Sequence, residues 1–89
     1  MENNQKGIES DMQQQKPTQE AMEMGRRFKR ARENRQLSLN AAAELSEFVS
    51  ASYIFRIEKG RTPSLSVIQN LAGVYKVSKE TLLGIEPIR

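Results

Sequence analysis

The side chains that could do chemistry in this sequence are its carboxylates, its lysines and arginines, and its hydroxyls, because it contains neither cysteine nor histidine. Without cysteine there is no thiol nucleophile and no thiolate metal ligand. Without histidine, the commonest general base and the commonest metal ligand are both missing. The glutamates show no pairing that would indicate a catalytic site. We therefore expect that the chain is not an enzyme and holds no metal and no cofactor.

The positive charge of the chain is concentrated after its first 22 residues. Residues 1–22 hold two lysines and four acidic residues, whereas the remainder holds twelve lysines or arginines and seven glutamates. A length of 89 residues allows one small domain. Because the basic part is also the part that carries apolar periodicity, we expect the folded domain to bind a polyanion.

The stretch from Ser38 to Gly60 predicts two short helices joined by a tight turn. Ser38 can cap the first helix through its side-chain oxygen, and Ser50 can cap the second. Ile54 and Ile57 stand three residues apart, which is helical spacing for a buried stripe. Gly60 is a residue of the type that commonly ends a helix in the left-handed conformation. Two helices of this size cannot bury a core alone, so the flanking segments must pack around them.

Three further helices are predicted around this pair. One runs from a cap at Thr18 to about residue 35, one from a cap at Ser64 to residue 75, and a short one follows a cap at Ser78. The residues expected to face the core are Met24, Phe28 and Ala31 in the first helix, Leu65, Ile68, Leu71, Ala72 and Tyr75 in the second, and Leu82, Leu83 and Ile85 at the end. Five helices without any strand pattern predict an all-α fold.

Residues 1–17 are expected to form a flexible polar tail, and residues 18–89 the folded domain. The tail is rich in Asn, Gln and Glu and has no apolar period, so it cannot bury enough surface to offset its ordering entropy. No apolar run approaches the roughly 20 residues that span a membrane. The first residues also lack the apolar region of a signal peptide. We therefore expect a soluble, cytoplasmic protein without a membrane partner.

The order of these features resembles the Cro/repressor-type, or Xre-like, helix-turn-helix family over about residues 24–85. The resemblance is carried by Arg32, Leu37, Ser38, Ala43, Glu44, Val49, Ser50, the run from Tyr53 to Gly60, Pro63, Ser64, Val77 and Ser78. Between Ala43 and Ile54 the chain has one residue more than the usual interval of the family. Glu47 stands nearest to the position of the family's turn glycine. The resemblance implies a five-helix, repressor-like DNA-binding domain.

The resemblance also implies a DNA interface, in which the helix over residues 50–59 lies in the major groove. The base-facing positions would be Ser50, Ala51, Ser52 and Arg56. Arg56 is the strongest candidate, because a guanidinium can contact guanine O6 and N7 together. The phosphate-binding positions would be Ser38, Asn40, Tyr53, Lys59, Arg61 and Thr62. Phosphate contacts position a protein on the duplex without carrying sequence information.

The resemblance further implies an ion pair between Arg32 and Glu58. The residue pattern agrees with this, because Glu58 directly follows Ile57 of the predicted buried stripe. A largely buried carboxylate needs a charged partner, or it shifts toward its neutral form. We therefore expect Glu58 to be structural.

Phe55 has two interpretations. It falls between Ile54 and Arg56, at a position where the family usually has a small polar residue. It is either a scattered surface hydrophobe, which is common, or a contact with a thymine methyl group or a protein partner.

The leading hypothesis is a sequence-specific transcription regulator, a repressor, that binds double-stranded DNA as a homodimer on a near-palindromic site. A close variant is the antitoxin of a toxin–antitoxin pair, which would also bind a toxin through its tail. A different class is a protein-interaction adaptor that uses the same fold without DNA and binds its partner through the tail or Phe55. The basic charge of the folded part argues against the adaptor.

Overall fold

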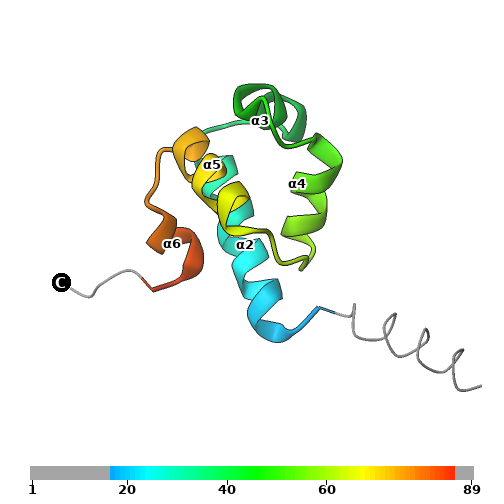
Figure 1. Ribbon diagram of the computed structural model, residues 1–89, viewed down its shortest axis with the longest axis vertical. Coiled ribbons are helices and arrows are strands. Elements are labelled where there is room, and N and C mark those ends of the chain that lie inside the picture. The colour runs from blue at the N-terminus through cyan, green and yellow to red at the C-terminus, as the bar shows by residue number, and fades with distance from the viewer. Residues whose placement is uncertain (1–16, 86–89) are drawn as a thin grey trace, which may run out of the picture.

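The computed structural model describes residues 17–85, so residues 1–16 of the predicted tail over residues 1–17 lie outside the described residues. The described part contains five helices and no strand: α2 (Gln19–Asn34), α3 (Leu39–Ser46), α4 (Ala51–Glu58), α5 (Leu65–Tyr75) and α6 (Lys79–Leu83) (Figure 1). The predicted all-α fold is confirmed, and each predicted helix of the domain is present.

Each of the described helices begins at a hydroxyl side chain, as the sequence predicts. The side-chain oxygen of the cap accepts a hydrogen bond from the backbone N–H three residues further on, at 3.0 to 3.3 Å. The five caps are Thr18, Ser38, Ser50, Ser64 and Ser78. Each cap satisfies a donor that has no acceptor within its own helix. Local chemistry therefore sets where the helices start.

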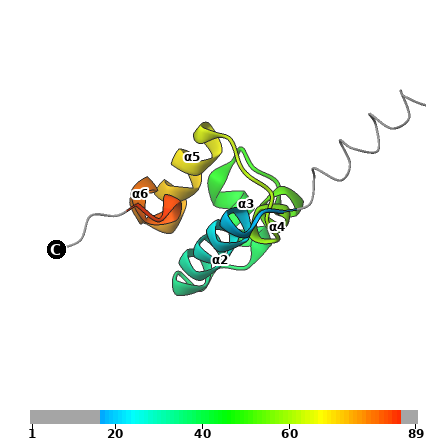
Figure 2. The ribbon, with the colours of Figure 1, turned by 90° about the horizontal axis from the view of Figure 1, so that it is seen from below.

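Helix α2 lies between α4 and α6 and packs against both (Figures 1 and 2). Helix α3 contacts α4 and α5, and α5 contacts α6, which closes the domain around one core. The buried apolar side chains of this core are Phe28, Ala31, Ala42, Val49, Ile54, Ile57, Val67, Ile68, Leu71, Ala72, Tyr75 and Leu82. Most of the residues predicted to face inward are among them, and Met24 and Leu83 pack against its edge.

Two residues predicted in the core are exposed instead. Leu65 is 57% exposed, because it is the first residue of α5 and helical side chains lean toward the N-terminal end of their helix, beyond the core. Val67, which was not predicted to face the core, is buried in that helix instead of Leu65. Ile85 is 64% exposed, because Gly84 ends α6 with a φ of 80° and turns the chain away from the core.

Gly25 allows α2 to approach the end of α4 closely. A Cβ atom at this position would lie 2.6 Å from the carbonyl oxygen of Ile57 and 2.8 Å from that of Glu58. Both obstacles are backbone atoms, which cannot move aside as the tip of a side chain can. The absence of a side chain at residue 25 is therefore what sets the distance between the first helix and α4.

Arg27 joins α2 to the end of α6. Its Nε donates to the carbonyl oxygen of Leu82 at 2.9 Å, and its Nη2 donates to that of Leu83 at 3.1 Å. The last carbonyl oxygens of a helix have no partner within it, so a guanidinium that reaches them caps the helix. Arg27 is thus a structural residue, unlike the exposed arginines on the other faces of α2.

Candidate nucleic-acid interface

The turn between α3 and α4 is built around the hydroxyl of Ser46, which is 5% exposed. Its Oγ accepts hydrogen bonds from the backbone N–H groups of Phe48 (3.2 Å) and Val49 (2.9 Å) and lies 2.8 Å from the carbonyl oxygen of Ala43, to which it can donate. Sequence reasoning missed this role. The signal was a hydroxyl residue at the end of an apolar helix, where such side chains bond to nearby backbone.

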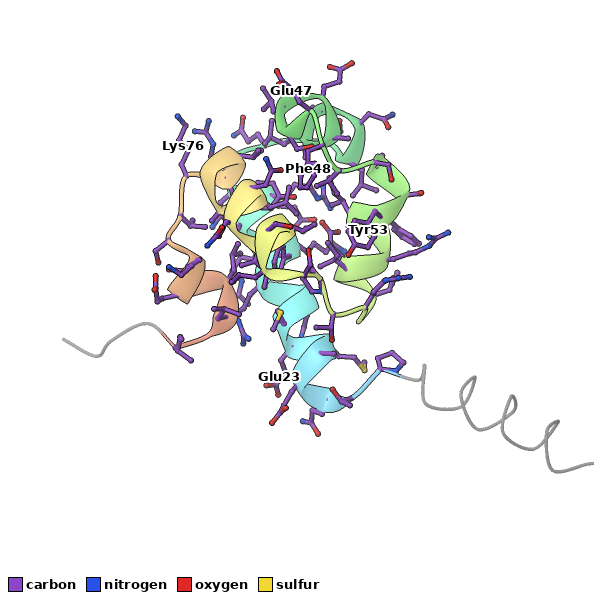
Figure 3. The ribbon with its side chains drawn as sticks, in the orientation of Figure 1. Glu23, Glu47, Phe48, Tyr53 and Lys76 are labelled. Carbon is purple, nitrogen blue, oxygen red and sulfur yellow. The ribbon has the colours of Figure 1, made fainter. Side chains whose placement is uncertain are left out.

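Glu47 supplies the left-handed residue of the turn. Its φ of 62° and ψ of 5° end α3, and its backbone N–H donates to the carbonyl oxygen of Ala43. Glu47 is also the residue that the sequence places nearest to the family's turn glycine. Glycine adopts this conformation without steric cost, whereas other residues rarely adopt it. Figure 3 shows Glu47 at the end of α3, remote from Tyr53 on α4.

Helix α4 has one buried face and one exposed face. Ile54 and Ile57 are 0% exposed and fix the helix to the core. The exposed residues of the helix and its C-cap are Ser52, Phe55, Arg56 and Lys59. Ser52 and Lys59 each stand three or four residues from both Phe55 and Arg56, so the four residues form a single stripe along the helix. We call this set of four residues the α4 stripe.

The predicted base-facing residues lie on or beside this stripe. Ser52 and Arg56 belong to the α4 stripe, Ser50 is exposed at the N-cap, and Ala51 is half-buried. The Oγ of Ser50 accepts the backbone N–H of Tyr53 at 3.1 Å. Since that oxygen is already an acceptor, the hydroxyl of Ser50 is best suited to donate to a ligand.

The predicted phosphate-binding residues fall into two groups. Ser38 and Asn40 are exposed at the start of α3, where the Oγ of Ser38 accepts the backbone N–H of Ala41. Lys59, Arg61 and Thr62 are exposed where α4 ends, and Tyr53 is half-buried within α4. The structure thus places Ser38 and Asn40 at the start of α3, Tyr53 in the first half of α4, and Lys59, Arg61 and Thr62 at the C-cap of α4 and in the loop that follows it.

Two cations of the second group lie over aromatic rings. The Arg61 guanidinium lies 5.4 Å from the ring centroid of Tyr53, and the Lys59 ammonium lies 5.3 Å from that of Phe55. Both distances are within the range of cation–π attraction. The backbone N–H of Arg61 also donates to the carbonyl oxygen of Arg56 at 2.9 Å, which fixes the loop against the helix end. These contacts hold the positive charges near α4.

Arg32 and Glu58 form a two-point ion pair between α2 and α4. Arg32 Nε lies 2.7 Å from Glu58 Oε2, and Nη2 lies 2.9 Å from Oε1. A third hydrogen bond runs from Arg32 Nη1 to the carbonyl oxygen of Leu37 at 2.8 Å. The hydrogen bond with Glu58 raises the pKa of Arg32. The Arg32 side chain is 11% exposed and the Glu58 side chain 5% exposed. This pair therefore positions α4 and is not part of the exposed interface.

Tyr75 has a hydroxyl that sequence reasoning did not single out. The side chain is 1% exposed, and the hydroxyl has no hydrogen-bond partner among the described residues. Burial, together with the Glu58 carboxylate, raises the pKa of Tyr75 above its ordinary value. The phenol is therefore neutral and part of the core, and it contributes nothing to the exposed face.

Within residues 17–85 the structure gathers no group of three or more carboxylates, histidines or cysteines that could hold a metal ion. None of the helices in this part of the chain is long and apolar enough to cross a membrane. The exposed chemistry of the α4 region therefore consists of hydroxyls, cations and aromatic rings.

A family model described as "Helix-turn-helix domain" matches residues 23–83. The match begins after the first turn of α2 and includes all of α3, α4, α5 and α6. No curated protein and no solved structure matches the chain significantly.

Proposed function

Because the chain belongs to the helix-turn-helix domain family, we propose that it is a sequence-specific transcription regulator that reads double-stranded DNA with α4. The helix lies in the major groove, with Ser50, Ala51 and Ser52 at its N-terminal end and Arg56 one turn further along facing base edges. The second helix of the motif in this chain is α4, which follows α3 after the tight turn at Ser46 and Glu47. The regulator acts in the cytoplasm as a repressor.

The observation that carries the proposal is the exposed α4 stripe on a helix whose opposite face is fully buried. Ser52 and Arg56 are one turn apart on this stripe, and both have hydrogen-bonding groups that base edges can meet. Arg56 has the greater power to discriminate, since its guanidinium can engage O6 and N7 of one guanine. Ser50 donates from the helix start, and Ala51 offers a methyl group to a neighbouring thymine.

The two groups of phosphate-binding candidates lie on either side of the reading helix in the chain. Ser38 and Asn40 belong to the start of α3, where free backbone N–H groups and the helix dipole favour an anion. Arg61 and Thr62 follow the end of α4, and Tyr53 holds Arg61 through the cation–π contact. Contacts on both sides would fix the register of α4 along the groove.

A homodimer on a near-palindromic site completes the proposal. One reading helix with a single arginine on its exposed stripe contacts few base pairs, which gives limited discrimination. A second copy reads a second half-site about one helical turn of DNA away and multiplies the discrimination.

Selection of bound duplexes from a random pool tests the proposal, with affinities then measured at several salt concentrations. We expect an enriched sequence with two related halves, and a binding constant for unrelated duplexes that falls with salt. Enrichment of a single half, with one chain bound per duplex, would contradict the homodimer. Uniform binding of all sequences would contradict sequence-specific regulation.

Failure to bind any duplex at any salt concentration would favour the adaptor instead. One observation makes this alternative concrete: Leu45 and Phe48 are 57% and 61% exposed at the end of α3 and in the following turn. An open hollow lies next to Leu45, lined by Arg35, Leu45, Asn70, Gly73, Val74 and Lys76. Exposed apolar side chains beside a hollow are typical of protein-binding surfaces.

A further inference from the structure

Phe55 is the one large apolar side chain of α4 that faces solvent. It is 47% exposed, whereas Ile54 and Ile57 on the same helix are 0% exposed. It lies on the α4 stripe directly before Arg56 and three residues after Ser52. A side chain on this stripe meets whatever the stripe binds.

The surroundings of Phe55 argue against a protein-binding patch. The other large apolar side chains that are clearly exposed within residues 17–85 belong to other elements: Met22, Leu45, Phe48, Leu65 and Ile85. Phe55 is followed by Arg56 and covered by the Lys59 ammonium at 5.3 Å from its ring centroid. Protein interfaces are depleted of charge at their centres, so a ring covered by the Lys59 ammonium, on a stripe that also carries Arg56, fits a polyanion better than a protein partner.

We infer that Phe55 is a specificity-determining residue that contacts the C5-methyl group of a pyrimidine in the major groove, beside the base that Arg56 contacts. This inference rests on the proposed function of α4. Thymine is distinguished in the major groove by its methyl group, and apolar side chains, phenylalanine included, recognise it by direct contact. Phe55 thereby adds an apolar contact to a helix face that otherwise offers hydrogen bonds and charge.

Lys59 supports this contact from the same stripe. Its ammonium attracts the ring of Phe55 through the π face, which restricts the ring and lowers the entropy lost on binding. The positive charge also lies at the end of α4, where the DNA backbone would pass. One residue pair therefore combines a methyl contact with neutralisation of a phosphate.

The chemistry of the contact extends beyond thymine. 5-Methylcytosine carries its methyl group on the same ring carbon and in the same groove as thymine does. Cytosine and 5-methylcytosine both pair with guanine and differ only in this methyl group. A contact that depends on the methyl group alone will therefore favour 5-methylcytosine over cytosine. Cytosine methylation at this position would thus strengthen binding by the chain.

The test compares four duplexes that differ at one position of the selected site: thymine, uracil, cytosine and 5-methylcytosine, each with its complementary base. Each thymine of the site is replaced in turn. At one position in each half, we expect uracil to bind about fourfold more weakly than thymine, and cytosine about fourfold more weakly than 5-methylcytosine, as burial of one methyl group predicts. Loss of the methyl leaves every hydrogen-bonding group of the base pair in place, so the ratio reports the apolar contact alone.

Two variants assign the effect to Phe55. We call the affinity for thymine divided by that for uracil, and the affinity for 5-methylcytosine divided by that for cytosine, the two methyl ratios. In Phe55→Ala both methyl ratios should fall to one, because the ring is gone. Phe48→Ala is the matched control, since it removes the same ring from a more exposed position outside α4 and should leave both ratios unchanged. Thermal melts of both variants verify that they are folded.

The outcomes separate this inference from the proposed function. The role of Phe55 would be overturned if the chain bound a specific site in which no thymine was sensitive to loss of its methyl group. It would also be overturned if the methyl ratios were unchanged in Phe55→Ala. In both cases DNA recognition would stand, and Phe55 would be available to a protein partner. Equal loss of the ratios in Phe48→Ala would also overturn the role of Phe55. Absence of any duplex binding by the parent chain would instead remove the proposed function itself.

Discussion

Arg32 and Glu58 meet at two points, with 2.7 Å from Nε to Oε2 and 2.9 Å from Nη2 to Oε1, although they are 26 residues apart. The pair joins the C-terminal half of α2 to the last residue of α4. Two parallel hydrogen bonds fix direction as well as distance, which a single contact would not do. The orientation of the exposed α4 stripe therefore depends on a contact that lies beneath it.

Removing either partner of this pair should destabilise the domain. We expect Arg32→Ala and Glu58→Ala each to lower the free energy of unfolding by about 3–5 kcal/mol, because the remaining charge is left buried and unpaired. Urea denaturation measures the change. Arg35→Ala is the matched control, since this arginine is exposed just after α2 and should change stability by less than about 0.5 kcal/mol. If Arg32→Ala kept full stability but weakened DNA binding, Arg32 would be a phosphate contact instead.

Two glycines should respond to alanine with opposite signs. Alanine is the better helix former by about 1 kcal/mol, so propensity alone favours both changes. Gly73→Ala, with open space around its new Cβ, should raise the free energy of unfolding by about 0.5–1 kcal/mol. Gly25→Ala should lower it by about 1–3 kcal/mol, because the new atom would lie 2.6 Å from the Ile57 carbonyl oxygen. Stability gained in Gly25→Ala would show that α2 and α4 can separate without cost.

Much of this fold follows from local chemistry that one segment contains by itself. The caps at Ser38 and Ser50 and the paired isoleucines of α4 need no knowledge of the neighbouring helices, and the sequence predicts all of them. Gly25 and Arg27 are different, because their importance depends on which backbone atoms another helix brings near. Neither residue has a local signature. Leu65 shows the converse, since its spacing fits the buried face but its place at the helix start leaves it exposed.

The candidate site divides in the same way. The resemblance supplies the positions on α4, and the exposed stripe is compatible with them. Apart from the Arg32–Glu58 pair, which the resemblance implies, the contacts that orient individual side chains are not periodic and could not be predicted. Arg61 meets the ring of Tyr53 only because the chain turns back at Gly60, where φ is 115°. The place of Ser46 at the end of an apolar helix indicates a bond to nearby backbone, but it does not specify the N–H groups of Phe48 and Val49 as the donors.

The stability of the domain should fall in alkaline solution because of Tyr75. Burial raises the pKa of this phenol above its ordinary value of 10.0, so the unfolded chain ionises first as the pH rises. The stabilising effect is complete below pH 10 and is lost above it, by up to about 1.4 kcal/mol per pH unit. Tyr75→Phe should remove this loss. At pH 7 it should change stability little, since the hydroxyl has no partner among the described residues.

Urea denaturation of the parent chain and of Tyr75→Phe, at pH 7 and at several values above 10, measures the effect. The difference between the two proteins is the informative quantity, because it cancels the titration of the lysines. Parallel loss of stability in both proteins would mean that the phenol is not the group responsible.

Arg56 and Arg61 should differ in what they contribute to DNA binding. Arg56 lies on the exposed stripe of α4, so Arg56→Ala should cost roughly 1–3 kcal/mol on the selected site and relax specificity at one base pair. Arg61 follows the end of α4 and lies over the Tyr53 ring. Arg61→Ala should instead weaken all duplexes alike and make the salt dependence shallower by about one unit.

The backbone bond from Arg61 to the Arg56 carbonyl remains in both variants, so the helix end should stay folded, which thermal melts verify. Titrations on selected and scrambled duplexes at several salt concentrations measure the contrast. Identical behaviour of the two variants would mean that Arg56 contacts phosphate, because a contact with a base edge cannot weaken every sequence equally.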